Sequence, residues 1–259
     1  MDYGYRMLRH VVAQVFGNFG QAISLTFLPT FLPMVVLLGL FMMWGVSFTA
    51  VGAPFADPGP NASVNDGVVF LTVLGGVVVS MITYCWAAVG WHRYILLEEH
   101  GNGLMPRWHG SMILSYLGRS MLIGLIAIGV AIAGLLALGA LILAVPVPAV
   151  AMLLTFGFST GLTWVVTRIG LILPAAALGR PMRIGESWQA TGAVSGHLLV
   201  PVLFITLAMT ILNQLVVVIF GASSLGMIPL ALIYWIQILL NLSLMTTLYG
   251  TQIEGRHLN

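Results

Sequence analysis

The chain has 259 residues, of which 59% are apolar and 6% are charged, and its mean hydropathy is +1.05. Soluble domains average about 25% charged residues, so this composition excludes an ordinary soluble protein and indicates an integral membrane protein. The net charge of +2 is too small to indicate a nucleic-acid partner, and a single cysteine excludes an internal disulfide and any CxxC metal or redox motif.

Long apolar segments follow one another along the chain. A transmembrane helix needs about 20 predominantly apolar residues. Six segments meet this requirement, at roughly 25–51, 68–92, 120–144, 148–168, 196–220 and 227–250. Short connections (VPVP and GASSLG) join the third span to the fourth and the fifth to the sixth, whereas a longer polar loop joins the first two. We therefore predict an all-α integral membrane protein whose six transmembrane helices form three hairpins in a single polytopic membrane domain, 1–259.

Arginine placement predicts the orientation. All nine basic residues are arginines, and all lie near the same ends of the spans, whereas the opposite side holds Asp57 and Asp66. Because cytoplasmic loops carry an excess of basic residues, both termini are expected in the cytoplasm. The lack of lysine, together with abundant Ala, Gly and Val, indicates a GC-rich bacterial genome, so we expect a bacterial inner (cytoplasmic) membrane protein.

The segments before the hairpins repeat a pattern. Arg93 is followed after thirteen residues by Pro106 and after seventeen by Gly110, and a second arginine is followed at the same intervals by a proline and a glycine. Apolar residues recur near helical spacing in three such segments: Met7, Val11 and Val15; Trp108, Met112 and Tyr116; Ile184, Trp188 and Thr191. We therefore predict a cytoplasmic amphipathic helix before each hairpin, in three repeats at 1–100, 101–179 and 180–259.

One stretch, RIGLILPAAALGRPMRIGESWQATG at 168–192, carries a distinctive set of residues. They are Arg168, Leu171, Pro174, Ala175, Ser187, Trp188, Thr191 and Gly192. This pattern resembles the R-x-x-L-x-x-P-A … S-W-x-x-T-x-G signature of a bacterial membrane-domain family. That family includes the non-catalytic membrane module of some glycerophosphodiester phosphodiesterases and stand-alone six-span proteins. The resemblance implies a membrane module without phosphodiesterase activity, because that chemistry belongs to a separate soluble barrel that we do not expect here.

The same stretch supplies the structural or interface candidates. Arg93 and Arg168 end their spans, so each guanidinium could extend to lipid phosphates. Alternatively, Arg168 pairs with Glu186 and fixes the third amphipathic helix beneath the bundle. We expect Pro174 to end the helix and Trp188, beside Ser187, to anchor at the membrane interface.

No catalytic or metal-binding constellation is evident. The six histidines lack the HxxxH and HExxH spacings that place two imidazoles on one helix face. A Gly-rich connection contains Glu98, Glu99 and His100. A membrane enzyme is the third hypothesis, and its activity would depend on these residues. We predict no catalytic residue, no metal and no cofactor.

Polar residues within the spans provide the second hypothesis. Amides lie well inside the predicted bilayer at Asn213, Gln214, Gln237 and Asn241, and the fourth span adds threonines and a GFSTG motif. We expect these groups to bond between adjacent helices and to support close packing. A transporter would use them as a substrate path instead, although the spans lack an ionisable residue near the midplane.

The function expected from the sequence is that of a non-catalytic multi-pass membrane scaffold or accessory protein. Its partners would be membrane lipids or a larger membrane protein complex, with no nucleic acid. The alternative is a transporter or lipid-handling protein that uses the polar residues of spans four to six.

Overall fold

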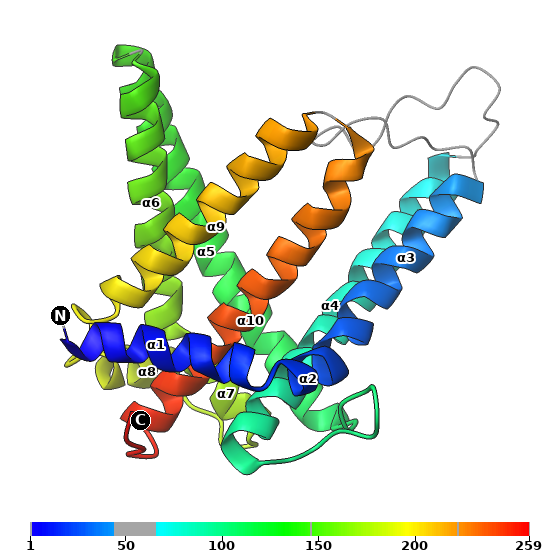
Figure 1. The fold of residues 1–259 in the computed structure, drawn as a ribbon, viewed down its shortest axis with the longest axis vertical. Coiled ribbons are helices and arrows are strands. Elements are labelled where there is room, and N and C mark those ends of the chain that lie inside the picture. The colour runs from blue at the N-terminus through cyan, green and yellow to red at the C-terminus, as the bar shows by residue number, and fades with distance from the viewer. Residues whose placement is uncertain (1, 44–65, 146, 222, 259) are drawn as a thin grey trace.

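The computed structural model of the chain describes residues 2–43, 66–145, 147–221 and 223–258, which form helices and no β-strand (Figure 1). Six helical segments among these residues are long and apolar enough to cross a membrane. The chain is therefore an all-α, multi-pass membrane protein, and the predicted number of spans is confirmed.

The observed spans agree well with the predicted ones. The first, Phe19–Phe41, contains α2 (Phe19–Ala22), a π-helical turn η1 (Ile23–Phe27) and most of α3 (Leu28–Met43). The others are α4 (Asp66–Leu97), α5 (Gly110–Ala144), α6 (Pro148–Ile169), α9 (Leu199–Phe220) and, after a short 3-10 turn η2 (Ser224–Gly226), α10 (Met227–Gln252). The predicted polar loop between the first two spans, with Asp57, lies outside the described residues.

The long helices lie side by side in pairs. Helix α3 packs along α4, α5 along α6, and α9 along α10, and the three pairs diverge away from the end that holds both termini (Figure 1). We call that end the base; it contains α1 (Asp2–Gly17), α7 (Ile172–Ala177), α8 (Ile184–Ala190) and the nearest ends of the long helices.

The core of the protein is at the base, around α7. All six residues of α7 are buried, and the helix contacts α4, α5 and α10. Its three consecutive alanines, Ala175 to Ala177, are at most 1% exposed, and small side chains of this kind allow neighbouring helices to approach closely. Far from the base the helices present apolar side chains outward: Leu143 is 84% exposed and Val218 is 79% exposed.

Helix α1 lies across the base and packs on α9 and α10 (Figure 1). Met7, Val11 and Val15, which recur every four residues, are fully buried, whereas Tyr5 and Phe16 are exposed. This distribution follows from the helical period, because residues four apart lie on the same face.

The second predicted amphipathic segment is not a separate helix. Met112 and Tyr116 lie in the first two turns of α5, which continues without a break for 35 residues. At about 1.5 Å per residue α5 is about 52 Å long, well beyond the roughly 30 Å hydrocarbon core of a bilayer. The helix is continuous because 110–144 contains no proline. The third segment does form a separate helix, α8, after the GRPM interruption in which Gly179 has φ +70°.

We predict that Gly4→Ala weakens the docking of α1. A Cβ at this position would lie 2.5 Å from the His197 carbonyl oxygen and 2.9 Å from the Val200 Cβ. The substitution should cost about 1–3 kcal/mol through overpacking, measured as a lower thermal unfolding midpoint in detergent. Gly17→Ala is the matched control, because a Cβ at Gly17 has no neighbour within 4 Å. Equal midpoints for the two variants would show that α1 is not packed as described.

Candidate functional site

The break between α6 and α7 starts four residues before Pro174. We expected this proline to end the fourth span, but α6 ends at Ile169 and Pro174 is buried inside α7. Proline has no N–H to bond the carbonyl four residues earlier, and its ring clashes with that carbonyl. For Pro174 this carbonyl belongs to Gly170, which is the C-cap of α6. Pro174 therefore interrupts the helix at Gly170, four residues before its own position.

Ser187 of α8 closes this break. Its Oγ donates to the Arg168 carbonyl oxygen at 2.7 Å and accepts from the Leu171 backbone N–H at 3.2 Å. Both contacts are buried, so the hydroxyl satisfies two main-chain groups that the broken helix would otherwise leave without partners. One side chain thereby fixes α8 against the point where α6 becomes α7.

The Arg168 side chain has neither of its predicted environments. Its residue is only 7% exposed, its Nη2 donates to the Trp188 carbonyl at 2.9 Å, and its Nε donates to Thr191 Oγ1 at 3.3 Å. The guanidinium carbon lies 3.5 Å from the Trp188 ring centroid and 5.1 Å from that of Trp164. The guanidinium therefore stacks on tryptophan instead of extending to lipid phosphates.

The predicted pairing of Arg168 with Glu186 is also absent from the described contacts. Glu186 is the third residue of α8, and its Oε2 accepts the Arg183 backbone N–H at 2.8 Å. This is the capping contact of a glutamate at the start of a helix. Because Glu186 lies close to the start of its own helix, this hydrogen bond forms at a lower free-energy cost than a long-range ion pair.

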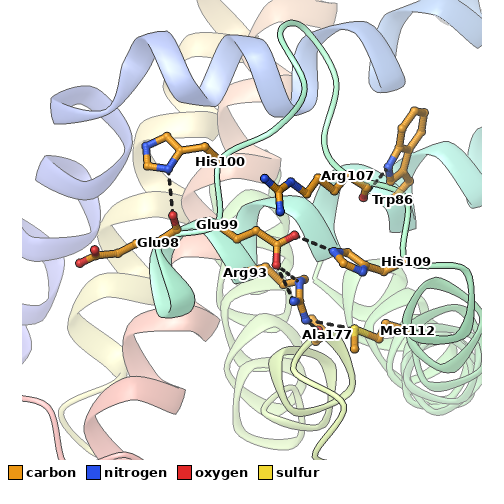
Figure 2. A network of polar contacts seen from close by, with 9 residues as sticks. All are labelled: Trp86, Arg93, Glu98, Glu99, His100, Arg107, His109, Met112 and Ala177. Atoms are coloured by element: carbon orange, nitrogen blue, oxygen red, sulfur yellow. Dashed lines mark hydrogen bonds and ion pairs between the residues drawn. The ribbon is translucent and has the colours of Figure 1, made fainter.

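A second polar network joins α4, the following connection and α5 (Figure 2). Arg93 donates from Nε and Nη2 to Glu99 Oε2, at 3.0 and 2.5 Å, and from Nη1 to the Ala177 carbonyl at 3.2 Å. The other carboxylate oxygen of Glu99 lies 2.6 Å from His109 Nε2. Arg93 thus links the connection to the C-terminal end of α7. The sequence also allowed an Arg93 guanidinium that extends to lipid phosphates, but in the structure it contacts protein groups.

The Glu99 carboxyl is held in its ionised form. Burial by itself would raise its pKa, but the hydrogen bonds and charges of Arg93 and His109 lower the pKa from 4.5 to about 2. A carboxylate bound on both oxygens has little capacity to act as a general base near neutral pH. The network is therefore suited to holding the connection in place.

The membrane-enzyme hypothesis gains no catalytic arrangement from these residues. The Glu98 side chain points away from Glu99, and His100 Nδ1 bonds the Glu98 carbonyl oxygen at 2.9 Å (Figure 2). Within the described residues no group of three His, Cys, Asp or Glu side chains is placed to hold a metal ion.

Asn213 and several hydroxyls of the spans bond within their own helices, where we expected interhelical bonds. Asn213 Nδ2 donates to the Met209 carbonyl at 2.8 Å, and the hydroxyl of Thr163 donates to the carbonyl four residues earlier. Gln214 is exposed, and Gln237 and Asn241 are half-buried. The expected bonds fail because the side chain reaches its own helix backbone at a shorter distance than a neighbouring helix.

Sequence reasoning missed the polar contacts that join α4 to α10. Trp91 Nε1 donates to Ser243 Oγ at 3.0 Å, and His92 Nδ1 lies 2.7 Å from Thr246 Oγ1, with all four residues buried. These partners are about 150 residues apart, so no local spacing could reveal them. The one available signal was a Trp-His pair at the end of an apolar span.

Comparisons with protein-family models, with curated proteins and with solved structures found no match to this chain. The resemblance of 168–192 to a bacterial membrane-domain family therefore stays a prediction. What the structure adds is contact among the residues of that pattern: Arg168, Leu171, Ser187 and Thr191 form one buried cluster, which the half-exposed Trp188 contacts.

We predict that Ser187→Ala strongly destabilises the protein. The variant leaves the Leu171 N–H buried without a partner and leaves the Arg168 carbonyl only the longer bond from Thr191 Oγ1 at 3.4 Å, which should cost about 1–3 kcal/mol. Ser159→Ala is the control, because its hydroxyl bonds only the Phe156 carbonyl of its own helix. The measurement is the free energy of unfolding in a denaturant series in detergent. Equal losses for the two variants would contradict the role of Ser187.

The Glu99 network predicts a specific pH dependence. Because the folded pKa of about 2 lies below the ordinary value of 4.5, the ionised carboxylate stabilises the fold fully above about pH 4.5. That contribution is lost as the pH falls from 4.5 toward 2. Glu99→Gln should therefore lower stability by about 2 kcal/mol at pH 7, and this difference should shrink toward pH 2.

Thermal unfolding of both proteins across this pH range measures the effect. Glu98→Gln is the control, since that carboxylate is exposed and has no ion pair or hydrogen bond among the described residues. A difference for Glu99→Gln that stays constant down to pH 2 would contradict the network.

Proposed function

We propose that this chain is a non-catalytic membrane scaffold or accessory protein that binds lipid or a larger membrane protein. One observation carries the proposal: the buried and half-buried charged groups at the α6–α7 break and around Glu99 are used in contacts within the chain, while the spans present apolar faces outward. Arg168, Glu99 and Glu186 each have protein partners. Leu136 and Met152, by contrast, are each 72% exposed. Such faces need lipid chains or another helix as neighbours.

We place the protein in a bacterial inner membrane as three helical hairpins with their amphipathic helices in the cytoplasm. The distribution of all nine arginines supports this orientation through the positive-inside rule. The exposed Trp188 of α8 and the exposed Tyr5 and Phe16 of α1 are suited to the headgroup region, where aromatic side chains accumulate. In this arrangement the base is a cytoplasmic platform.

A transporter or lipid-handling protein is the second candidate, and two polar atoms favour it. Thr160 Oγ1 of α6 and Asn213 Oδ1 of α9 are buried without a hydrogen-bond partner among the described residues, and α6 contacts α9. Unsatisfied polar groups at membrane depth are expensive, which makes them candidates for contact with a substrate.

The test is gentle affinity purification from native membranes with a C-terminal tag, followed by mass spectrometry of proteins and lipids. We expect a stoichiometric membrane protein or one strongly enriched lipid. Arg168→Ala should lower both the abundance of the protein and the recovery of its partner, because it removes the contacts to Trp188 and Thr191. A hydrogen bond to a charged group typically contributes about 1.5–3 kcal/mol.

The matched control is Arg180→Ala. The Arg180 side chain is 71% exposed and its contact with Glu254 is 3.9 Å long, so abundance and recovery should be unchanged. Recovery of the protein alone, without an enriched lipid, would refute the scaffold, and co-purification of a small polar molecule would favour the transporter. The tag also tests the orientation, since protease outside intact spheroplasts should leave it attached.

A further inference from the structure

A cavity of about 680 Å³ opens in the base, where α1, the end of α4, α10 and the C-terminal tail meet. Its volume is within the range of small-molecule sites, about 300–1,000 Å³. The side chains that line it include His10 and Gln14 of α1, Glu98 and His100 after α4, Thr247 of α10, and His257 of the tail. It is separate from the clusters around Arg168 and Glu99.

Two buried oxygen atoms in this cavity have no hydrogen-bond partner among the described residues. They are Thr247 Oγ1, on a residue only 4% exposed, and Gln14 Oε1. The neighbouring Thr246 shows what a threonine normally does in a helix, because its Oγ1 donates to the Leu242 carbonyl at 2.7 Å. Buried polar groups are almost always paired, so both atoms indicate a missing partner; the Gln14 amide oxygen needs a donor, and the Thr247 hydroxyl can accept from one.

Glu98 brings a carboxylate to the same cavity at a conformational cost. Its φ of 55° is left-handed, and among the described residues it is the one non-glycine with a positive φ. Helices commonly end on a left-handed residue, but that residue is usually glycine. A carboxylate at this left-handed position, on the wall of the cavity, is a candidate ligand group.

The electrostatic surroundings favour a positive ligand. The end of α10, at Gln252, lies beside the cavity, and helix C-termini carry partial negative charge. Arg256 also lines the cavity, but its guanidinium already donates to the Ile95 and Leu96 carbonyls and to Glu254. A phosphate would therefore find no guanidinium available among these groups, whereas a cation finds acceptors on three chain segments.

We propose that this cavity binds a primary ammonium group, carried either by the headgroup of a phospholipid or by a free amine. An ammonium group has three N–H donors, which match the acceptors of Gln14, Glu98 and Thr247. A metal ion fits less well, because no group of three His, Cys, Asp or Glu side chains among the described residues is placed to coordinate one. If the ammonium group belongs to a phospholipid, the proposal rests on the proposed function, because that function places α1 at the level of the headgroups. Binding of a free amine does not depend on it.

The experiment compares ligands that differ in N–H donors. The purified protein is placed in nanodiscs of choline-headgroup phospholipid containing a minor fraction of ethanolamine-headgroup phospholipid, and retained lipids are counted by native mass spectrometry. Free ethanolamine and putrescine are titrated calorimetrically in detergent. We expect selective retention of the ethanolamine lipid or binding of a free amine, and these two results identify the source. The quaternary ammonium of choline has no N–H and should not be retained.

Three variants test the assigned groups. Glu98→Gln and Thr247→Val should each weaken binding about tenfold, as expected for a lost hydrogen bond to a charged group. Thr155→Val is the matched control, because that exposed hydroxyl bonds the carbonyl of its own helix. Glu98→Gly should weaken binding without lowering the unfolding midpoint, since glycine adopts φ 55° readily.

The proposal is overturned if choline and ethanolamine lipids are retained equally and no free amine binds. It is also overturned if Glu98→Gln and Thr247→Val bind as the unsubstituted protein does, or if Glu98→Gly keeps full affinity. Recovery of a protein partner from native membranes is measured on the unsubstituted protein, so failure of amine binding is distinguishable from failure of the scaffold proposal.

Discussion

The two hydrogen bonds of Ser187 to the main chain at the α6–α7 break determine where α7 can lie. Because α6 stops at Ile169, the following six residues can turn into the centre of the base, where α4, α5 and α10 pack against them. Arg93 then bonds the carbonyl of Ala177 at the other end of α7. The two arginine-containing clusters therefore hold opposite ends of one short, buried helix.

The same constraint explains why the polar residues of the base are structural. A helix broken near the membrane surface exposes main-chain groups that lipid cannot satisfy. Ser187, Thr191 and Arg168 satisfy those groups or each other, and Trp188 covers the guanidinium with its ring. The spans, in contrast, satisfy their backbones internally, and several of their hydroxyls, such as that of Thr163, bond back onto the same helix.

Much of the fold could be predicted from the sequence, because a bilayer imposes a length and an apolar composition on every span. The last three spans were predicted within three residues at each end. Arg168, Ser187 and Trp188, which were candidates together, lie in contact, whereas neither environment considered for Arg168, lipid phosphates or Glu186, is the one observed. Hydropathy does not indicate how a chain folds back over twenty residues, nor that Pro174 disrupts the helix four residues earlier. The continuity of α5 was missed because its periodic N-terminal turns and its apolar transmembrane part were interpreted as two separate helices. The cavity around Glu98 and Thr247 combines segments more than 140 residues apart, which no local pattern contains.

The buried bond between Trp91 and Ser243 spans 152 residues of the chain. At a synthesis rate of about 5–20 residues per second, α4 leaves the ribosome roughly 10–30 s before α10 follows it. Throughout that interval the indole N–H of Trp91 has no native acceptor, although the helix that carries it is already long enough to enter the bilayer. The base is therefore assembled late in biogenesis, and α4 must be kept from incorrect helix pairing until α10 is inserted.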